Sequence, residues 1–541
     1  MEFKKPAEFD SLIKDLKNKL GVSENEDGSY EYTKDWSISD VRDDKNRQYI
    51  DLVQKGGGVL GIALVGFTYV LEEVGIRFLR LAGTSAGAIN TIMLAAIGNK
   101  EDKKSDKVLE FLNKKDIFDF VDGHKIVKIL INFFLKYNEK FKLFKTIPIL
   151  YLITVFGGIF YLISPYGAGS NFSIIVFYII CILVTILVLI IALAVILYRR
   201  MGQAGLGLNP GENFLIWLRD VLWTSNNEGK PRNLESNKIE ERVFTTNDLI
   251  RKVKQCPPLH LVNNKDQKIS DLEGDITIIT TELMTQNKIE LPKMKGLFKS
   301  RNQYQPFEDA AEMVRASMAI PLFFESFYAR NIDKELTKDQ WNEYFKIVNP
   351  TECRFVDGGV LSNFPINIYF NPTIDTPRLP TIGIDLQTNE IPPVIEGNDD
   401  KNINTSHQWN LISYVGKVFN STRNYYDKEF IQKNEVLQKS IAKVTITDAH
   451  WLDFGMDKDK KAKLFMQGAM AAYEFLSKEK FKPKKTQIED IKANDLKSTL
   501  RKVFKKITVT EESSPNTDTN SFNWKSYKAE RSQMSKDLKS P

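Results

Sequence analysis

Residues 49–97 read YIDLVQKGGGVLGIALVGFTYVLEEVGIRFLRLAGTSAGAINTIMLAAI. Apolar residues alternate before each glycine-rich turn and recur at helical spacing after it. The segment therefore predicts a strand, a glycine-rich loop, a helix, a second strand, a tight turn and a second helix, at 49–54, 56–61, 62–74, 78–81, 83–87 and 88–97. This order predicts two parallel strands joined by a helical crossover.

Three later segments extend the predicted sheet. Ile276–Thr281, Arg354–Val356 and Thr381–Asp385 are apolar or β-branched and are bounded by turn residues. A further helix has its apolar residues between Leu464 and Phe475. Strands separated by helices predict an α/β fold, a three-layer α/β/α sandwich whose mainly parallel sheet has helices on both faces.

The tight turn Gly83-Thr84-Ser85-Ala86-Gly87 has the G-x-S-x-G pattern of a nucleophile elbow. The small residues Gly83 and Gly87 allow a strained backbone that exposes the serine hydroxyl. The helix that follows directs its positive N-terminal end toward the negative charge that develops during attack. Ser85 is therefore the candidate nucleophile.

The loop Gly56–Gly61 has the spacing G-x-G-x-x-G, which fits two kinds of site. In a dinucleotide-binding fold, an acidic residue is expected about 20 residues further on, at the end of the second strand. Here the second strand leads into the elbow instead. We therefore predict an oxyanion hole, in which the amides of Gly57 and Gly58 point toward Ser85 and Gly56 and Gly61 complete the loop.

Asp357-Gly358-Gly359 follows the predicted strand Arg354–Val356. Glycines beside an aspartate allow its carboxylate to approach another loop closely. The same tripeptide is also common in plain turns. Asp357 is the candidate catalytic base, and Gly358 and Gly359 complete its loop.

No charged residue occurs between Lys145 and Arg199. About 20 apolar residues cross a bilayer core about 30 Å thick. The apolar residues 146–164 and 172–198 therefore predict a transmembrane hairpin, with a re-entrant first segment or two buried core helices as alternatives. Lysines precede the first segment, and Arg199 and Arg200 follow the second. The positive-inside rule thus predicts that both flanking parts lie on the cytoplasmic side.

The composition argues against several classes of protein. A net charge of +6 over 541 residues is too small to indicate a nucleic-acid-binding domain. The three cysteines, Cys181, Cys256 and Cys353, are far apart, as is usual for a protein of a reducing compartment without a disulfide framework. We expect no metal, no cofactor and no nucleic-acid partner, and the sequence leaves the oligomeric state open.

Together the three motifs resemble the patatin-like phospholipase family, over most of the chain outside the apolar hairpin and the two polar ends. Gly56–Gly61 resembles the oxyanion motif of the family, Ser85 its nucleophile and Asp357 its catalytic aspartate. The segment Val314–Pro321 resembles the family's segment before the aspartate. Two features depart from the pattern: Leu60 stands where members usually carry Arg or Lys, and the hairpin is absent from the common core.

Composition, the apolar runs and the resemblance together predict five segments. These are a polar N-terminal segment (1–45), the first part of the patatin-like domain (46–135), the hairpin (136–200, with spans at about 146–164 and 172–198), the second part of the domain (201–480) and a basic, largely disordered tail (481–541). Residues 214–223 fit either a helix at the membrane interface or a plain core helix.

The resemblance also implies a Ser–Asp dyad, in which Asp357 takes the proton of Ser85 and water hydrolyses the acyl-enzyme. We therefore expect a phospholipase A or lysophospholipase that acts on membrane lipids from the cytoplasmic side of a bacterial inner membrane. A Ser–Asp–His triad that uses His407 or His450 is an alternative mechanism. Transacylation by the same dyad and a catalytically inactive membrane scaffold are alternative functions.

Overall fold

The computed structural model describes residues 6–125, 128, 146–164, 171–203, 205–227, 230–236, 238–302, 304–388, 425–447, 449–481 and 522–539. The α-helices are α1 (Ala7–Leu20), α2 (Gly61–Glu73), α3 (Ala86–Ala96), α4 (Ser105–Lys114), α7 (Thr146–Ile163), α8 (Asn171–Gln203), α9 (Glu212–Asn226), α10 (Thr246–Lys254), α11 (Ala310–Ser317), α12 (Lys334–Phe345), α14 (Glu435–Gln438), α15 (Lys458–Ser477) and α17 (Trp524–Lys539). The strands are β1 (Val22–Glu24), β2 (Tyr30–Tyr32), β3 (Val41–Asp43), β4 (Gln48–Gln54), β5 (Ile76–Thr84), β6 (Gly207–Asn209), β7 (Leu259–Leu261), β8 (Asn264–Lys268), β9 (Asp275–Glu282), β10 (Asn287–Leu291), β11 (Leu322–Phe324), β12 (Phe327–Arg330), β13 (Glu352–Asp357), β14 (Thr381–Gln387) and β15 (Ile441–Thr445).

The centre of the fold is a sheet that has 11 strands within the described residues. Its middle strands β15, β14, β4, β5 and β9 are neighbours in that order, and every pairing among them is parallel. Antiparallel strands extend the sheet: β10 and β13 both pair with β9, β12 pairs with β13, and β3, β7 and β8 follow one another from the start of β4. The α/β fold predicted from the sequence is confirmed, with the parallel strands at its centre.

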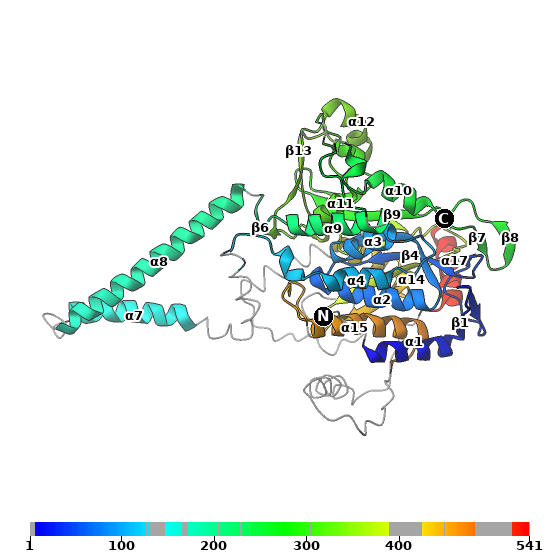
Figure 1. The fold of residues 1–541 in the computed structure, drawn as a ribbon, viewed down its shortest axis with the longest axis horizontal. Helices are drawn as coiled ribbons and strands as arrows, with labels where there is room; N and C mark the ends of the chain where they lie inside the picture. Colours follow the sequence, from blue (N-terminus) through cyan, green and yellow to red (C-terminus); the bar gives the residue numbers. More distant parts are fainter. Residues whose placement is uncertain are drawn as a thin grey trace, which may run out of the picture.

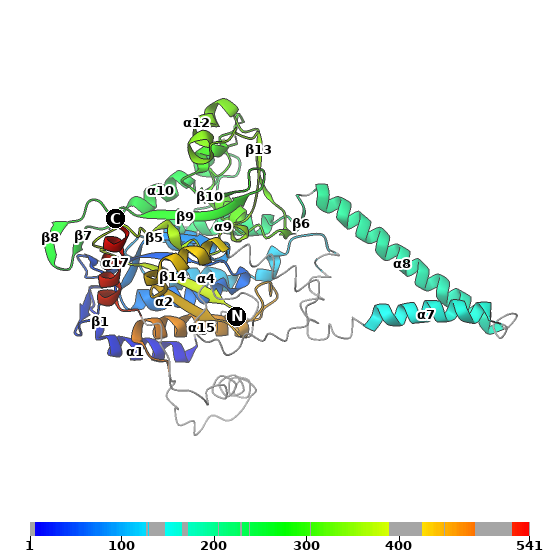
Figure 2. The ribbon, with the colours of Figure 1, turned by 180° about the vertical axis from the view of Figure 1, so that it is seen from behind.

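Both faces of the sheet are covered (Figures 1 and 2). On one face, Ile50 and Leu52 of β4 belong to the largest apolar core, which includes residues of α2, α3, α11 and α15. On the other face, Val53 of β4 packs in a smaller core with Phe364 and Leu437. The alternation of these side chains along β4 follows from the two-residue period of a strand, and it gives the sandwich its three layers.

Helix α15 packs closely against α2, the helix that follows the glycine-rich loop. A Cβ atom on Gly66 would lie 2.0 Å from the carbonyl oxygen of Phe465, and one on Gly468 would lie 1.8 Å from that of Ala63. Only glycine allows the two backbones to approach so closely. Helix α15 therefore fixes the position of α2.

The C-terminal end of the chain differs from the prediction of a largely disordered tail. Residues 522–539 contain α17, whose Trp524 and Tyr527 are buried in the main core together with Phe522. Arg531 of α17 donates a hydrogen bond to the carbonyl of Asn371. These few aromatic residues, spaced along one helix face, bury enough apolar surface to hold a helix that is otherwise polar.

Helices α7 and α8 extend away from the body of the molecule (Figure 1). Among the described residues one helix is long and apolar enough to cross a membrane: Phe172–Ile196 of α8 has 25 residues, and the rest of the protein covers none of its most apolar part. The 18-residue α7 contains a shorter apolar stretch, Leu150–Ile163. The hydroxyl of Tyr151 in α7 donates to the carbonyl of Leu183 in α8, at 3.1 Å.

The two ends of this insertion meet at one place on the body. The amide of Gly123 donates to Oδ1 of Asn209 at 3.0 Å. The carboxylate of Asp122 accepts hydrogen bonds from the amides of Gly211 and Asn213, at 2.9 and 3.0 Å, at the start of α9. A carboxylate at the start of a helix is also stabilised by the helix dipole. The segments before and after the insertion are thus held together.

Helix α9 follows the insertion and is a core helix over most of its length. Phe214, Leu218 and Leu222 are fully buried, which favours the core interpretation of residues 214–223. The ring of Phe120, from the segment before the insertion, contacts those of Phe214 and Trp217, with centroids 5.3 and 5.2 Å apart. Aromatic packing therefore reinforces the polar contacts between the two ends.

Candidate active site

Ser85 occupies the turn between β5 and α3 with φ 52° and ψ −117°. Residues other than glycine rarely adopt this backbone conformation, and it is the strain expected of a nucleophile elbow. The sharpness of the turn requires small neighbours, because a Cβ atom on Gly83 would lie 2.5 Å from the backbone of Gly87. Ser85 therefore lies on a strained, tightly packed strand-to-helix turn.

Strand β9 brings the candidate base to the candidate nucleophile. Along one edge of β9, Thr84 pairs with Ile279 in parallel register and Asp357 pairs with Thr280 in antiparallel register. The ends of β5 and β13 therefore meet at consecutive residues of β9. Ser85 follows Thr84 directly, so Ser85 and Asp357 lie side by side although they are 272 positions apart in the sequence.

The loop that carries Asp357 packs directly on the end of β5. A Cβ atom on Gly358 would lie 2.2 Å from the carbonyl oxygen of Ile279 and 3.0 Å from Cγ2 of Thr84. The hydroxyl of Thr84 donates to the carbonyl of Ser362 at 3.0 Å. The buried carboxylate of Asp357 accepts a hydrogen bond from the amide of Gly359 at 2.7 Å, which orients it.

The glycine-rich loop lies against the elbow. A Cβ atom on Gly56 would lie 3.2 Å from Cβ of Ser85, and one on Gly61 would lie 3.2 Å from Cβ of Ala86. The amide of Gly56 donates to the carbonyl of Asn363 and that of Val59 to the carbonyl of Trp451, both at 3.0 Å. Within the described part of the chain, the intervening amides of Gly57 and Gly58 have no protein acceptor. They are therefore available to a ligand beside Ser85.

Ser317, at the C-terminal end of α11, was not singled out from the sequence. Its hydroxyl accepts a hydrogen bond from the amide of Ser85 at 2.9 Å and donates one to the carbonyl of Ile279 at 2.6 Å. Ser317 thus fixes the elbow to the strand that aligns it with Asp357. The resemblance of Val314–Pro321 to a family segment was the signal that pointed to this region.

Asp427 is a second residue that sequence reasoning missed. Its carboxylate accepts hydrogen bonds from the hydroxyl of Ser362 and the amide of Phe364, at 2.8 and 2.7 Å. Burial raises the pKa of Asp427 to about 6. Asp427 holds the far end of the Asp357 loop, and nothing in its sequence surroundings distinguishes it from a solvated aspartate.

Leu60, the departure from the family pattern, is fully buried in the main core. A buried charge is found instead at Lys55, just before the loop, whose ammonium lies 2.5 Å from the carboxylate of Asp385. Both side chains are fully buried. Breaking such a pair by removing one partner costs about 3–5 kcal/mol, because the other charge stays buried.

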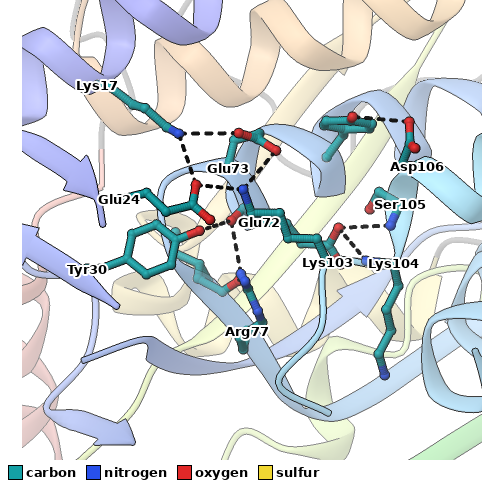
Figure 3. Close-up of polar contacts among 12 residues, drawn as sticks. Lys17, Glu24, Tyr30, Glu72, Glu73, Arg77, Lys103, Lys104, Ser105 and Asp106 are labelled. Carbon is teal, nitrogen blue, oxygen red and sulfur yellow. Dashed lines mark hydrogen bonds and ion pairs between the residues drawn. The ribbon is translucent and has the colours of Figure 1, made fainter. Parts of the chain in front are cut away.

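The far end of α2 is held by another buried carboxylate (Figure 3). Glu72 accepts hydrogen bonds from the amides of Lys104 and Ser105, at 2.9 and 2.8 Å, where α4 begins. Burial raises the pKa of Glu72. The backbone carbonyl of Glu72 accepts a further hydrogen bond from Arg77 at 2.9 Å. The helix that carries the glycine-rich loop is thus fixed to α4 at one end and to α15 along its length.

Two histidines, His407 and His450, are the alternative candidates for the catalytic base. His407 lies outside the described residues. Nδ1 of His450 accepts a hydrogen bond from the amide of Leu452 at 3.1 Å, and its ring stacks on Trp451. Trp451 in turn contacts the glycine-rich loop through its carbonyl. His450 therefore lies near the glycine-rich loop, and its role as a base is tested by mutation below.

A pocket opens beside Ser85. Gly58, Gly61 and Ser85 lie on its wall, and Ser85 and Asn90 are the polar side chains among its described lining residues. The others are apolar: Val59, Ile62, Val65, Ala86, Ile89, Met93, Leu112, Ile117, Phe120, Phe214, Trp217, Met318, Ile320, Phe324 and Phe454. A pocket of this composition suits an aliphatic chain rather than a polar ligand. Within the described residues no group of three or more His, Cys, Asp or Glu side chains could hold a metal ion.

A family model described as patatin-like phospholipase matches residues 52–369. The chain belongs to the patatin-like phospholipase family. Membership implies lipid acyl hydrolase activity, and the match spans all three motifs. The chain is 24% identical over 429 residues to the uncharacterized protein YqhO of Bacillus subtilis (strain 168). The aligned region covers 79% of this chain and 98% of YqhO. Among solved structures it is similar to VipD from Legionella pneumophila, with a TM-score of 0.34, 14% identity, and coverage of 83% of this chain and 68% of that chain.

Proposed function

We propose that this patatin-like protein hydrolyses fatty-acyl esters of membrane phospholipids or lysophospholipids through a Ser85–Asp357 dyad. Ser85 Oγ attacks the ester carbonyl carbon while Asp357 takes its proton. The carbon–oxygen bond to the alcohol then breaks, and Asp357 returns the proton to the departing oxygen. Water repeats the sequence on the acyl-enzyme and releases the fatty acid.

The observation that carries the proposal is the meeting of β5 and β13 on β9. Thr84 and Asp357 pair with consecutive residues of that strand, so the elbow and the carboxylate are adjacent. The free amides of Gly57 and Gly58 are suited to the oxyanion that forms during attack. The amide of Ser85 is not, because it already donates to Ser317. The apolar pocket suits the acyl chain.

The membrane part of the proposal concerns α8. Phe172–Ile196 is long enough to cross a bilayer core of about 30 Å at about 1.5 Å per residue. A buried core helix would be covered by the rest of the protein, but this stretch is uncovered. We infer that α8 is inserted in a membrane and that α7 packs beside it, with the catalytic body on the cytoplasmic side, where Arg199 and Arg200 follow the span.

The test is release of fatty acid by the purified full chain in detergent micelles. Mixed phospholipids and lysophospholipids serve as substrates, with EDTA present. We expect release by the parent and by Ser477→Ala, a control at the end of α15 whose hydroxyl, within the described part of the chain, bonds to nearby backbone carbonyl and amide groups. Ser85→Ala and Asp357→Asn are expected to abolish release, and a fluorophosphonate is expected to label Ser85 in the parent.

His450→Ala separates the dyad from a triad. We expect this variant to keep its turnover within a few-fold of the parent, since Asp357 is the base. A loss as large as that of Asp357→Asn would assign the base to His450 and contradict the dyad. If the folded parent neither releases fatty acid nor reacts with the fluorophosphonate, the chain is an inactive scaffold. Transfer of the acyl group to a second lipid rather than to water would identify a transacylase.

A further inference from the structure

A small apolar tip joins α8 to the wall of the pocket. Strand β6, which begins four residues after α8 ends, pairs in parallel with β11, and Gly207 lies opposite Leu322. The residue just before β6 and the first residue of β11 are exposed. Leu206 is 47% exposed and Leu322 64% exposed, and Pro321 between the core and Leu322 is also exposed. We call Leu206, Pro321 and Leu322 the tip.

Both leucines of the tip have a backbone conformation that is unfavourable for them. The φ angle is 62° at Leu206 and 68° at Leu322. Leucine rarely adopts the left-handed region, where the side chain crowds the backbone. Exposure of a large apolar side chain is a second unfavourable feature when the surroundings are water. Two neighbouring leucines, strained in the backbone and exposed at the side chain, indicate an interaction surface.

The tip can reach the bilayer because only a short stretch of chain separates it from the apolar span. The span in α8 ends at Ile196 and the helix at Gln203. Seven residues of helix extend about 10 Å, and three further residues to Leu206 extend at most about 10 Å. The headgroup layer on one side of a bilayer is about 5–8 Å thick. The turn at Leu206 can therefore return the chain to the surface from which α8 emerges.

The tip is also continuous with the pocket. Ile320 and Phe324 line the pocket on either side of Leu322 in the sequence. Asn209 of β6 donates a hydrogen bond to the carbonyl of Phe323 at 2.9 Å, so the two strands move as one unit. The buried Arg315 donates to the carbonyls of Pro210 and Glu325 and fixes this unit to α11. A surface that contacts the tip therefore also faces the rim of the pocket.

We propose that the tip of Leu206, Pro321 and Leu322 docks on the lipid surface into which α8 inserts, so that the pocket takes its lipid directly from that bilayer. The inference rests on the proposed function for its substrate, but the docking itself does not require catalysis. Apolar side chains at the headgroup boundary bind by burying their surface there. The occupant of this surface is thus a lipid bilayer rather than a second protein.

The contact is tested first by fluorescence. The full chain, with Cys181, Cys256 and Cys353 replaced by serine and Leu322 by cysteine, is labelled with an environment-sensitive NBD group and reconstituted in phosphatidylethanolamine–phosphatidylglycerol vesicles. We expect quenching by a doxyl group placed near the headgroup end of a lipid chain, and protection from aqueous iodide. Quenching by iodide alone would overturn the proposal. Protection from both quenchers would assign the tip to a protein contact, a second copy of the chain or another segment, and would overturn it as well.

The consequence for substrate is tested with a charged tip. In the same vesicles, Leu206→Glu/Leu322→Glu is expected to lower fatty acid release from the bilayer about tenfold, because burying even one leucine corresponds to about that factor. Hydrolysis of the water-soluble p-nitrophenyl butyrate is expected to stay unchanged. Leu538→Glu is the matched control: this leucine is 58% exposed on α17, at the end of the body away from β6 (Figures 1 and 2), and both activities are expected to stay unchanged.

The outcomes separate the two proposals. If the parent cleaves neither substrate, the proposed hydrolase fails, while the NBD measurement still decides the docking. If the parent cleaves both and the charged tip leaves both rates unchanged, the docking fails and the hydrolase stands. Leu322→Ala, whose smaller side chain preserves the fold, is expected to give an intermediate loss on the bilayer substrate. Equal loss on both substrates would indicate damage to the active site and would overturn the docking.

Discussion

Replacing Gly58 with alanine tests the oxyanion hole through its backbone. Gly58 has φ 58°, and a Cβ atom there would lie 2.1 Å from the carbonyl oxygen of Trp451. That oxygen is a backbone atom already bonded to the amide of Val59, so it cannot move aside alone. The loop must shift instead and carry the amides of Gly57 and Gly58 away from the site beside Ser85. Loss of one such donor lowers turnover by about 10²–10³-fold, or about 3–4 kcal/mol in the transition state.

Gly98→Ala is the matched control for this change. Gly98 also has φ 58°, but a Cβ atom there would lie 2.9 Å from Oδ2 of Asp102, the movable end of a side chain. Both variants carry the cost of alanine in the left-handed region, about 1–2 kcal/mol. Turnover is measured with p-nitrophenyl butyrate, and folding by thermal unfolding in detergent. We expect lower melting temperatures for both variants and a loss of turnover for Gly58→Ala alone. Near-parental turnover of a folded Gly58→Ala would refute the oxyanion assignment.

Three further changes have defined outcomes. Ser317→Ala leaves the amide of Ser85 and the carbonyl of Ile279 without their partner, at a cost of about 1–3 kcal/mol each. We therefore expect a lower kcat with little change in KM. Ser317→Thr, which keeps the hydroxyl, should restore part of the lost kcat. The stabilising effect of protonating Asp427, whose pKa burial raises to about 6, is complete below about pH 4 and is lost as the pH rises through 6. Melting curves should therefore show Asp427→Asn gaining on the parent between about pH 4 and 6, by up to about 3 kcal/mol, and a constant difference would contradict this. Met93→Ala enlarges the pocket two helical turns from Ser85, so the substrate preference in competition assays with mixed acyl chains should shift toward longer acyl chains. An unchanged preference would show that the acyl chain binds outside this pocket.

The parts of the fold that the sequence predicted are those with a strong local pattern. Strands β4 and β5 and the turns after them combine alternating apolar residues with closely spaced glycines, and such patterns depend on neighbouring residues only. The long apolar helix α8 is equally local, since it requires an uncharged run and nothing else. The α/β fold followed from the order of these elements.

The parts that the sequence did not predict depend on contacts between distant residues. The proximity of Ser85 to Asp357 is set by the register of β5 and β13 on β9, and no pattern in either strand encodes that register. Asp427 acquires its role only because the chain folds it against Ser362. Helix α17 is held by a few aromatic side chains within a lysine-rich segment, where polar composition outweighed their signal. Long-range pairing, rather than local propensity, decided each of these cases.

The hydrogen bonds that join Gly123 to Asn209 and Asp122 to Gly211 have a consequence for protein engineering. Since the chain leaves the body and rejoins it at the same place, the hairpin is topologically a detachable module. A short glycine–serine linker in place of residues 126–204 would close the gap without disturbing the strand order of the sheet. The shortened protein would keep the Ser85 pocket without the two apolar helices, would be suited to crystallisation, and would allow the proposed hydrolysis and the proposed membrane attachment to be tested separately.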